Sequence, residues 1–95
     1  MKYSIGLIET AGFVTALACA DRMIKSAYIE IHSINKVGSG MITVIIKGDL
    51  ASVQHAIEIG REVAGEYGEL IASRVIPRPY EGLEKLTATA EGGEQ

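Results

Sequence analysis

The sequence predicts an α+β domain of the ferredoxin-like class, in which two helices pack on one face of an antiparallel sheet. Segments typical of strands and helices follow each other in the order β-α-β-β-α-β along 95 residues, a length that suits one domain. A glycine-rich turn at 38–40 joins the two middle strands directly, which predicts a hairpin. Each of the other two connections is a helical segment long enough to cross a sheet.

The first predicted strand covers residues 3–9, and Gly6 within it indicates close approach by a neighbouring element. Thr10 has the side chain of a helix N-cap, and the helix that it begins runs to about Ser26. The apolar side chains of this helix form one stripe, namely Val14, Leu17, Ala18 and Ile24. Lys25 lies in the last turn, where a cation interacts favourably with the helix dipole.

Residues 36–48 contain a glycine-rich turn followed by an apolar strand, which we predict to lie at the centre of the sheet. Residues 28–35 precede it and alternate apolar with polar side chains, as a half-exposed strand does. Gly38-Ser39-Gly40 is a tight turn whose glycines permit close approach by a ligand, a phosphate or another copy of the chain. The run 41–46 is almost continuously apolar, which predicts a strand covered on both faces.

The second predicted helix begins after Asp49, a good N-cap residue, and ends at Gly68. Gly60 lies on its apolar face and permits close approach by another backbone. That face consists of Val53, Ala56, Ile57, Gly60, Ala64 and Tyr67. The spacing of these residues predicts that the helix packs on the sheet.

The C-terminal part of the chain contains a strand and its exit. Residues 69–76 are predicted to form the fourth strand, and Pro77-Arg78-Pro79 cannot continue a central ladder. Residues 81–86 are predicted to form one short helical turn. Residues 87–95 are small, polar and acidic, which predicts a disordered tail. The predicted folded domain therefore spans residues 1–86.

Composition argues against several kinds of function. Nine basic and twelve acidic residues give a net charge of -3 without a Lys/Arg cluster, so nucleic acid is not an expected partner. No apolar run is long enough to span a membrane. Cys19 lies among apolar neighbours and is expected to be a buried thiol in a reducing compartment. Glu9 and Thr10 interrupt an apparent signal peptide, so we expect an uncleaved, cytoplasmic protein.

We find no catalytic or metal-binding pattern in the sequence. His32 and His55 are the only histidines, and their spacing is not that of metal ligands. The carboxylates are spread over polar helix faces, where solvation explains them. We therefore expect neither an enzyme nor a bound cofactor. Gly38-Ser39-Gly40 could form an anion nest, but it lacks the ending of a P-loop and precedes a strand, so a hairpin turn is the simpler interpretation.

Five separated stretches agree with one pattern: Gly6-Leu7-Ile8-Glu9-Thr10 followed by an Ala-rich helix, Asp21-Arg22-Met23-Ile24-Lys25-Ser26-Ala27, Lys36-Val37-Gly38-Ser39-Gly40, Ile46-Lys47-Gly48-Asp49 and Val75-Ile76-Pro77-Arg78-Pro79. Together they closely resemble the single-domain (BMC-domain) shell proteins of bacterial microcompartments. The resemblance runs from about Lys2 to Leu86, in order and without evident gaps. It is strongest to the hexamers of catabolic compartments, such as those that process propanediol or ethanolamine, and carboxysome hexamers share the plan.

The resemblance implies a structural protein without enzymatic activity. Such proteins form flat cyclic homohexamers that tile with other shell proteins around encapsulated enzymes. The loop that matches Gly38, Ser39 and Gly40 surrounds a pore on the symmetry axis, and Lys36 would add positive potential near its entrance. A ring of serine hydroxyls and backbone N–H groups suits small polar metabolites.

The resemblance also implies roles at the edge of the hexamer. Lys25 matches a lysine that pairs with its copy across a two-fold axis, and Arg78 matches an arginine that inserts between neighbouring hexamers. A long stem with a charged head can pack on a neighbour and donate to its carbonyls. Tyr28 stands near this edge where relatives often carry a smaller polar residue, so we expect it to alter the contact between tiles.

Two other functions remain open from the residues alone. A ferredoxin-like ligand-binding or regulatory module would form a smaller oligomer and bind an anion at the Gly-Ser-Gly loop. A small enzyme of the same fold, for instance an acyl-phosphate hydrolase, would need an Arg and an Asn around the loop after the first strand. Glu9-Thr10-Ala11-Gly12 offers neither residue.

Overall fold

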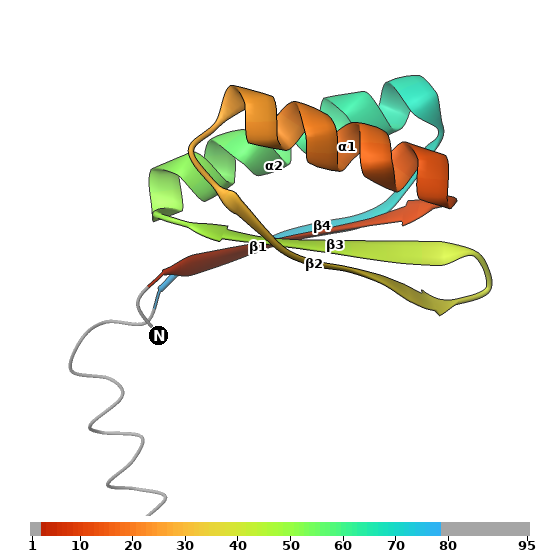
Figure 1. Ribbon diagram of the computed structural model, residues 1–95, viewed down its shortest axis with the longest axis horizontal. Coiled ribbons are helices and arrows are strands. Elements are labelled where there is room, and N and C mark those ends of the chain that lie inside the picture. Colours follow the sequence, from red (N-terminus) through yellow and green to blue (C-terminus); the bar gives the residue numbers. More distant parts are fainter. Residues whose placement is uncertain (1–2, 79–95) are drawn as a thin grey trace, which may run out of the picture.

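The computed structural model describes residues 3–78. Its elements are β1 (Ser4–Ala11), α1 (Phe13–Ser26), β2 (Glu30–Gly38), β3 (Met41–Gly48), α2 (Leu50–Tyr67) and β4 (Glu69–Ile76). The strands form one antiparallel sheet in the order β2-β3-β1-β4, and both helices cover the same face of it (Figure 1). The predicted ferredoxin-like class is confirmed. The predicted helical turn at 81–86 and the predicted tail at 87–95 lie outside the described residues.

The core lies between the helices and the sheet, and it is built largely from short side chains. Its buried hydrophobic members are Ile8, Ala16, Cys19, Ala20, Met23, Ile42, Val44, Ile46, Val53, Ala56, Ile57, Val63 and Ala64. The Cys19 thiol donates to the carbonyl oxygen of Gly60 at 3.3 Å, which joins α1 to α2. Burial raises the pKa of Cys19 to about 11, so the thiol is protonated and structural, as expected.

The start of α1 differs from the prediction. Thr10 lies inside β1, because the ladder continues to Ala11, which pairs with Met41 of β3. The Thr10 hydroxyl donates to the carbonyl oxygen of Gly12 at 3.2 Å. Gly12 occupies the N-cap position with a φ of 91°, and no side chain caps the helix. The expected N-cap role of Thr10 is therefore wrong, because strand pairing holds this residue in the sheet.

Of the predicted apolar stripe of α1, only Ala18 packs against the core. Val14, Leu17 and Ile24 are exposed, with Val14 exposed to 74%. The helix instead buries its small side chains together with Met23, which brings it close to the sheet and to α2. In α2, likewise, the predicted core residue Tyr67 is exposed. Alternative apolar faces on one helix cannot be ranked by period alone.

An irregular register adapts β2 to the core. The pairing with β3 shifts between Ile31 and Ser33, so His32 is an extra residue in the edge strand. Ile31 and Ile34 are three residues apart, and a regular strand would turn them to opposite faces. With the bulge, both pack against the core. The strand covers Glu30–Gly38, two residues later in its start and three later in its end than predicted.

The closest approach between elements is at Gly60. A Cβ atom there would overlap the Cδ1 atom of Ile8 and lie 2.9 Å from the Sδ atom of Met23. The predicted close approach occurs at this residue, but the atoms nearest to an added Cβ belong to the side chains of Ile8 in β1 and Met23 in α1, and not to another backbone. Gly65 is a useful comparison, since it lies in the same helix with nothing within 4 Å of an added Cβ.

We predict that Gly60→Ala destabilises the protein by about 1–3 kcal/mol, because the added methyl group overpacks the contact with Ile8 and Met23. Gly65→Ala should instead stabilise it by about 0.5–1 kcal/mol through helix propensity. Urea unfolding at one fixed protein concentration measures both changes. Equal effects of the two substitutions would contradict the packing role of Gly60.

Candidate functional site

The turn between β2 and β3 is a two-residue hairpin turn. Gly38 pairs with Met41, which leaves Ser39 and Gly40 as the loop. Their φ angles are 53° and 76°, and a turn of type I′ requires positive φ at both positions. Gly38 has a φ of 99°. No heavy atom lies within 4 Å of a Cβ built on Gly38 or Gly40. Within one chain, glycine is therefore needed at these positions for the positive φ angle and not to avoid a steric clash. The predicted tight turn is confirmed.

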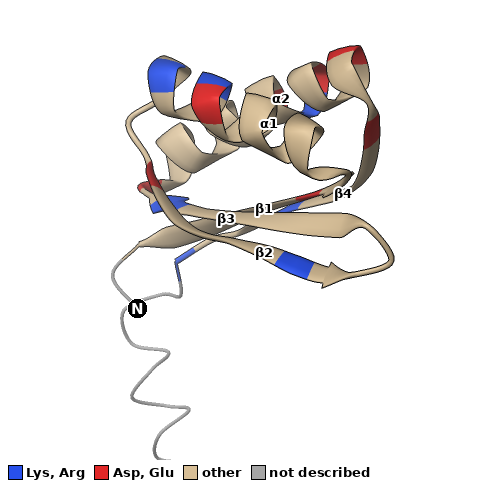
Figure 2. Cartoon of the chain, turned by 45° about the vertical axis from the view of Figure 1, so that its right-hand side comes forward, with Lys and Arg blue, Asp and Glu red and all other residues tan. Residues whose placement is uncertain are grey.

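The turn is anchored at its base and exposed at its tip. The backbone N–H of Gly12 donates to the carbonyl oxygen of Gly40 at 2.8 Å, which ties the turn to the start of α1. Lys36 is the one basic residue of β2 and lies close to the turn (Figure 2). It pairs with Ile42, whose side chain faces the helices, and directly opposite residues share a face of the sheet. The turn therefore presents a hydroxyl, backbone groups and a nearby ammonium group to its surroundings.

The residues predicted for the edge lie at the other end of the molecule. The end of α1, the start of α2 and the end of β4 meet at the end opposite the β2–β3 turn (Figure 1). Lys25 lies in the last turn of α1 with its Nζ 3.1 Å from the Asp21 carboxylate. Tyr28 follows and is 91% exposed. The backbone N–H of Arg78 donates to the Ser4 hydroxyl at 2.9 Å.

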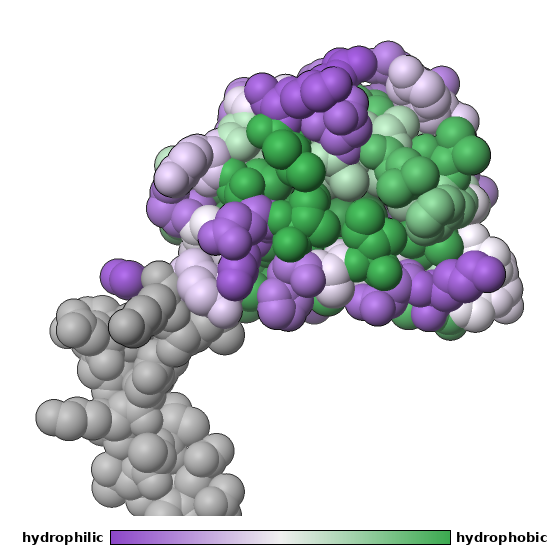
Figure 3. All heavy atoms as spheres, in the orientation of Figure 1, coloured by the Kyte–Doolittle hydropathy of each residue, from purple (hydrophilic) through white to green (hydrophobic). Residues whose placement is uncertain are grey.

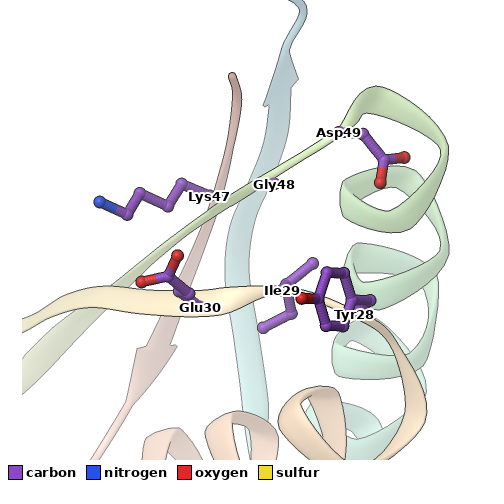
Figure 4. Close-up of a pocket in the computed structure, with 6 residues that line it drawn as sticks. All are labelled: Tyr28, Ile29, Glu30, Lys47, Gly48 and Asp49. Carbon is purple, nitrogen blue, oxygen red and sulfur yellow. The ribbon is translucent and has the colours of Figure 1, made fainter. Parts of the chain in front are cut away.

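Two hollows at this end share Asp49. The first, of about 320 Å³, is lined by Tyr28, Ile29, Glu30, Lys47, Gly48 and Asp49 (Figure 4). The second, of about 360 Å³, is lined by Tyr3, Ser4, Asp49, Leu50 and Arg78. Tyr28 and Arg78, which are 50 positions apart in the sequence, thus each line a hollow to which Asp49 also contributes. Sequence reasoning missed this arrangement and assigned Asp49 only a capping role.

The capping role of Asp49 is confirmed and determines its charge. Its carboxylate accepts hydrogen bonds from the backbone N–H and the hydroxyl of Ser52, at 3.0 and 2.9 Å. The bond from the Ser52 backbone is the main cause that lowers the pKa of Asp49, so this carboxyl is ionised at neutral pH. Glu30 and Lys47 are directly opposite each other in the ladder. The residues that line the first hollow thus include two acidic side chains and one basic side chain, and Ser52 binds the carboxylate of one of the acidic residues, Asp49.

The histidines are not brought together by the fold. His32 lies at the bulge of the edge strand β2, whereas His55 lies on the exposed side of α2. In the part of the chain from 3 to 78, no three His, Cys, Asp or Glu side chains are grouped as metal ligands would be. In the same range, no helix is long and apolar enough to cross a membrane.

Comparison with known proteins identifies the family. The sequence pattern of the BMC domain matches residues 4–79, which is most of the chain. The chain belongs to the BMC-domain family. The microcompartment shell proteins PduA of Citrobacter freundii and of Salmonella typhimurium are each 41% identical to it over 83 residues. These alignments cover 87% of the chain and 89% and 88% of the two relatives.

Further relatives come from carboxysomes and from solved structures. The carboxysome shell protein CcmK2 of Synechocystis is 40% identical over 86 residues, covering 88% of this chain and 84% of that protein. A microcompartment protein of Desulfitobacterium hafniense superposes with a TM-score of 0.75 at 26% identity over 87% of this chain, which spans only 45% of that longer chain. The PduA and CcmK2 relatives are both described as shell proteins. The predicted family, structural class and place in a microcompartment shell are therefore confirmed.

The conformation of the turn makes Gly40 the sensitive position in the hairpin. We predict that Gly40→Ala destabilises the protein by about 1 kcal/mol, because an L residue pays for a positive φ. Ser39→Asn should be neutral to within about 0.5 kcal/mol, since Asn tolerates the left-handed region. Thermal unfolding of the two variants measures the difference, and a harmless Gly40→Ala would rule out the type I′ turn.

Proposed function

We propose that the chain forms a cyclic homohexamer that tiles into a microcompartment shell, with a central pore for small polar metabolites. The observation that carries this proposal is the separation of the two sites along the molecule. The Gly38-Ser39-Gly40 turn lies at one end, while Lys25, Tyr28 and Arg78 lie at the opposite end (Figure 1). A subunit of a flat ring needs two different ends, because one end faces the symmetry axis and the other faces the neighbouring hexamer.

The contact between subunits of the ring is best supplied by the exposed apolar side chains of α1. Phe13, Val14, Leu17 and Ile24 are all exposed, and an apolar patch is visible on the face of the molecule that carries this helix (Figure 3). Exposed apolar side chains that are contiguous mark an interaction surface. A heterologous contact through such a patch closes into a ring when the rotation per subunit is suitable.

The pore would be lined by Gly38, Ser39 and Gly40, with Lys36 near its entrance. Glycines on both sides of Ser39 leave only its hydroxyl to project from each turn, so six copies would place polar groups around the opening. The ammonium group of Lys36 favours anions over cations close to the entrance. Small polar and anionic metabolites are the substrates that this lining suits.

The contact between hexamers would use the edge residues and the first hollow. Lys25 and Arg78 carry positive charge at the same end as the hollow formed by Glu30, Lys47 and Asp49. Cationic heads of one tile can therefore approach a pocket with excess negative charge on the next. Tyr28 lines the hollow and is positioned to pack against the aliphatic stem of such a side chain.

Native mass measurement followed by electron microscopy of the same sample tests assembly. We expect a species six times the 10.1 kDa chain that grows into hexagonally ordered layers. Lys25→Ala should keep this mass and lose the layers, because it removes the edge cation and, within the chain, only an exposed ion pair with Asp21 that contributes little to stability. The matched control is Arg22→Ala, which removes an exposed cation from the same helix and should leave the layers intact. A monomer or trimer, or ordered layers of Lys25→Ala, would contradict the assignment.

Permeation tests the pore separately. Ser39→Leu should preserve hexamers and slow the passage of polar substrates through assembled shells by about tenfold or more, because six leucines narrow and dewet the opening. Ser39→Asn keeps a polar side chain and accepts the same φ, so it controls for changes in the turn. Unchanged passage in assembled Ser39→Leu shells would show that metabolites do not cross at this turn.

A further inference from the structure

The molecule has two different flanks. The sheet order β2-β3-β1-β4 places β2 at one edge and β4 at the other. Of the two helices, α1 packs over β1, β2 and β3, whereas α2 packs over β1, β3 and β4. The first flank is therefore formed by α1 and β2, and the opposite, second flank is formed by α2 and β4. A heterologous contact joins two different surfaces of the same chain, and a pair of opposite flanks provides them.

The large apolar side chains of α1 point toward the first flank. Each residue turns a helix by about 100°, so residues two positions apart point to nearly opposite sides. The Cys19 thiol donates to the carbonyl oxygen of Gly60, so Cys19 faces α2, and Thr15 lies one turn earlier on the same side. Phe13 and Leu17 precede these two residues by two positions each. They therefore face away from α2.

These side chains leave an apolar patch on the first flank. Phe13 is 53% exposed, Leu17 is 44% exposed, and Ile24 continues the stripe at 51%. Figure 3 shows an apolar patch with hydrophilic side chains above and below it. Contiguous apolar surface with a polar border is typical of a protein interface.

The second flank contains a hollow. Its volume is about 400 Å³, and it is lined by Leu70 of β4 together with Glu58, Arg61 and Glu62 of α2. Leu70 is half-buried and supplies the apolar part of the lining. An apolar residue surrounded by charged side chains can receive one large side chain from a partner, while the charged border keeps water out of the contact.

The patch and the hollow lie at the same distance from the β2–β3 turn. In the ladder, Lys36 of β2 pairs with Ile42, Ile42 pairs with Thr10, and Thr10 pairs with Leu70 of β4. This row crosses the sheet from the first flank to the second, and Phe13 begins α1 three residues after Thr10. Rotation about an axis at the turn keeps every residue at its own distance from the axis, so surfaces at equal distances meet.

The charges of the two flanks are also complementary. Lys36 ends the row at the first flank, whereas the hollow on the second flank has two carboxylates and one guanidinium group. When Arg61 pairs with one of these carboxylates, the other is left to attract Lys36 of a neighbouring copy. Charges at the border of an interface contribute mainly to specificity, while the apolar contact at its centre contributes most of the affinity.

We infer that Phe13 of each subunit packs on Leu70 of the next subunit, so that the first flank of one copy covers the second flank of its neighbour. The inference rests on the proposed hexamer and names the two surfaces that form its ring contact. Within one chain Phe13 and Leu70 do not meet, because they belong to opposite flanks of a sheet whose four strands span about 14 Å.

Disulfide trapping in the full chain tests the contact. Hexamers with Phe13→Cys and Leu70→Cys should give a ladder of cross-linked species up to six chains on electrophoresis without reductant, because every contact then contains both cysteines. The control pair, Phe13→Cys and Ile76→Cys, should form this ladder at least about tenfold more slowly, since Ile76 lies roughly 20 Å along β4 from Leu70. Cys19 is buried and stays outside this chemistry.

The native mass of the same samples separates this inference from the proposed hexamer. A mass of six chains without the ladder, or equally fast ladders from both pairs, would overturn the inference and leave the hexamer in place. A ladder that stops at two chains would show a symmetric contact between like surfaces and would also overturn the inference. A native mass other than six chains would overturn both.

Dissociation of the hexamer on dilution is a second measurement, which needs no cross-link. Phe13→Ser should raise the concentration at which hexamers dissociate by about tenfold or more, because truncating an aromatic anchor weakens an interface strongly. Ile76→Ser removes a side chain of similar exposure, 44% against 53%, from the far end of β4 and should change this concentration by less than about twofold. Equal shifts for the two variants would contradict the contact at Phe13.

Discussion

The structure depends on how closely α2 approaches β1 and α1 at Gly60. With no side chain there, Ile8 and Met23 fill the space between the layers, and the Cys19 thiol reaches the Gly60 carbonyl. The helices can pack this closely only because both carry small residues at the contact. Close packing increases the dispersion contacts between the layers. A protein with few aromatic side chains can pack tightly in this way, but it buries less area per residue, which favours assembly with other copies as a further source of stability.

This tight packing determines what remains on the surface. Because α1 buries its small side chains, its larger ones at 13, 14, 17 and 24 are left outside, where a second copy can cover them. A chain of this size therefore has more apolar surface than its own core uses, and the exposed side chains of α1 are explained if the protein functions within an assembly.

The antiparallel arrangement gives the subunit its two ends. Every strand and helix runs along the same dimension, so connections collect at one end or the other. The β2–β3 turn lies at one end, and the charged hollow around Asp49 lies at the other. Substitutions at the pore and at the edge can thus be made independently. The free-energy changes of substitutions at distant sites without shared contacts are nearly additive.

The sequence alone determined the features that depend on neighbouring residues: the order of elements, the Ser39-Gly40 turn, the capping by Asp49 and the BMC-type motifs. Local rules suffice there because backbone conformation and hydrogen bonding act over a few residues. The tertiary structure alone decided that Thr10 belongs to β1, which face of α1 is buried, and that Asp49 lines one hollow with Tyr28 and another with Arg78. These three outcomes depend on strand register and on which helix face packs on the core. Contacts between segments that are distant in the chain determine both the register and the packing face.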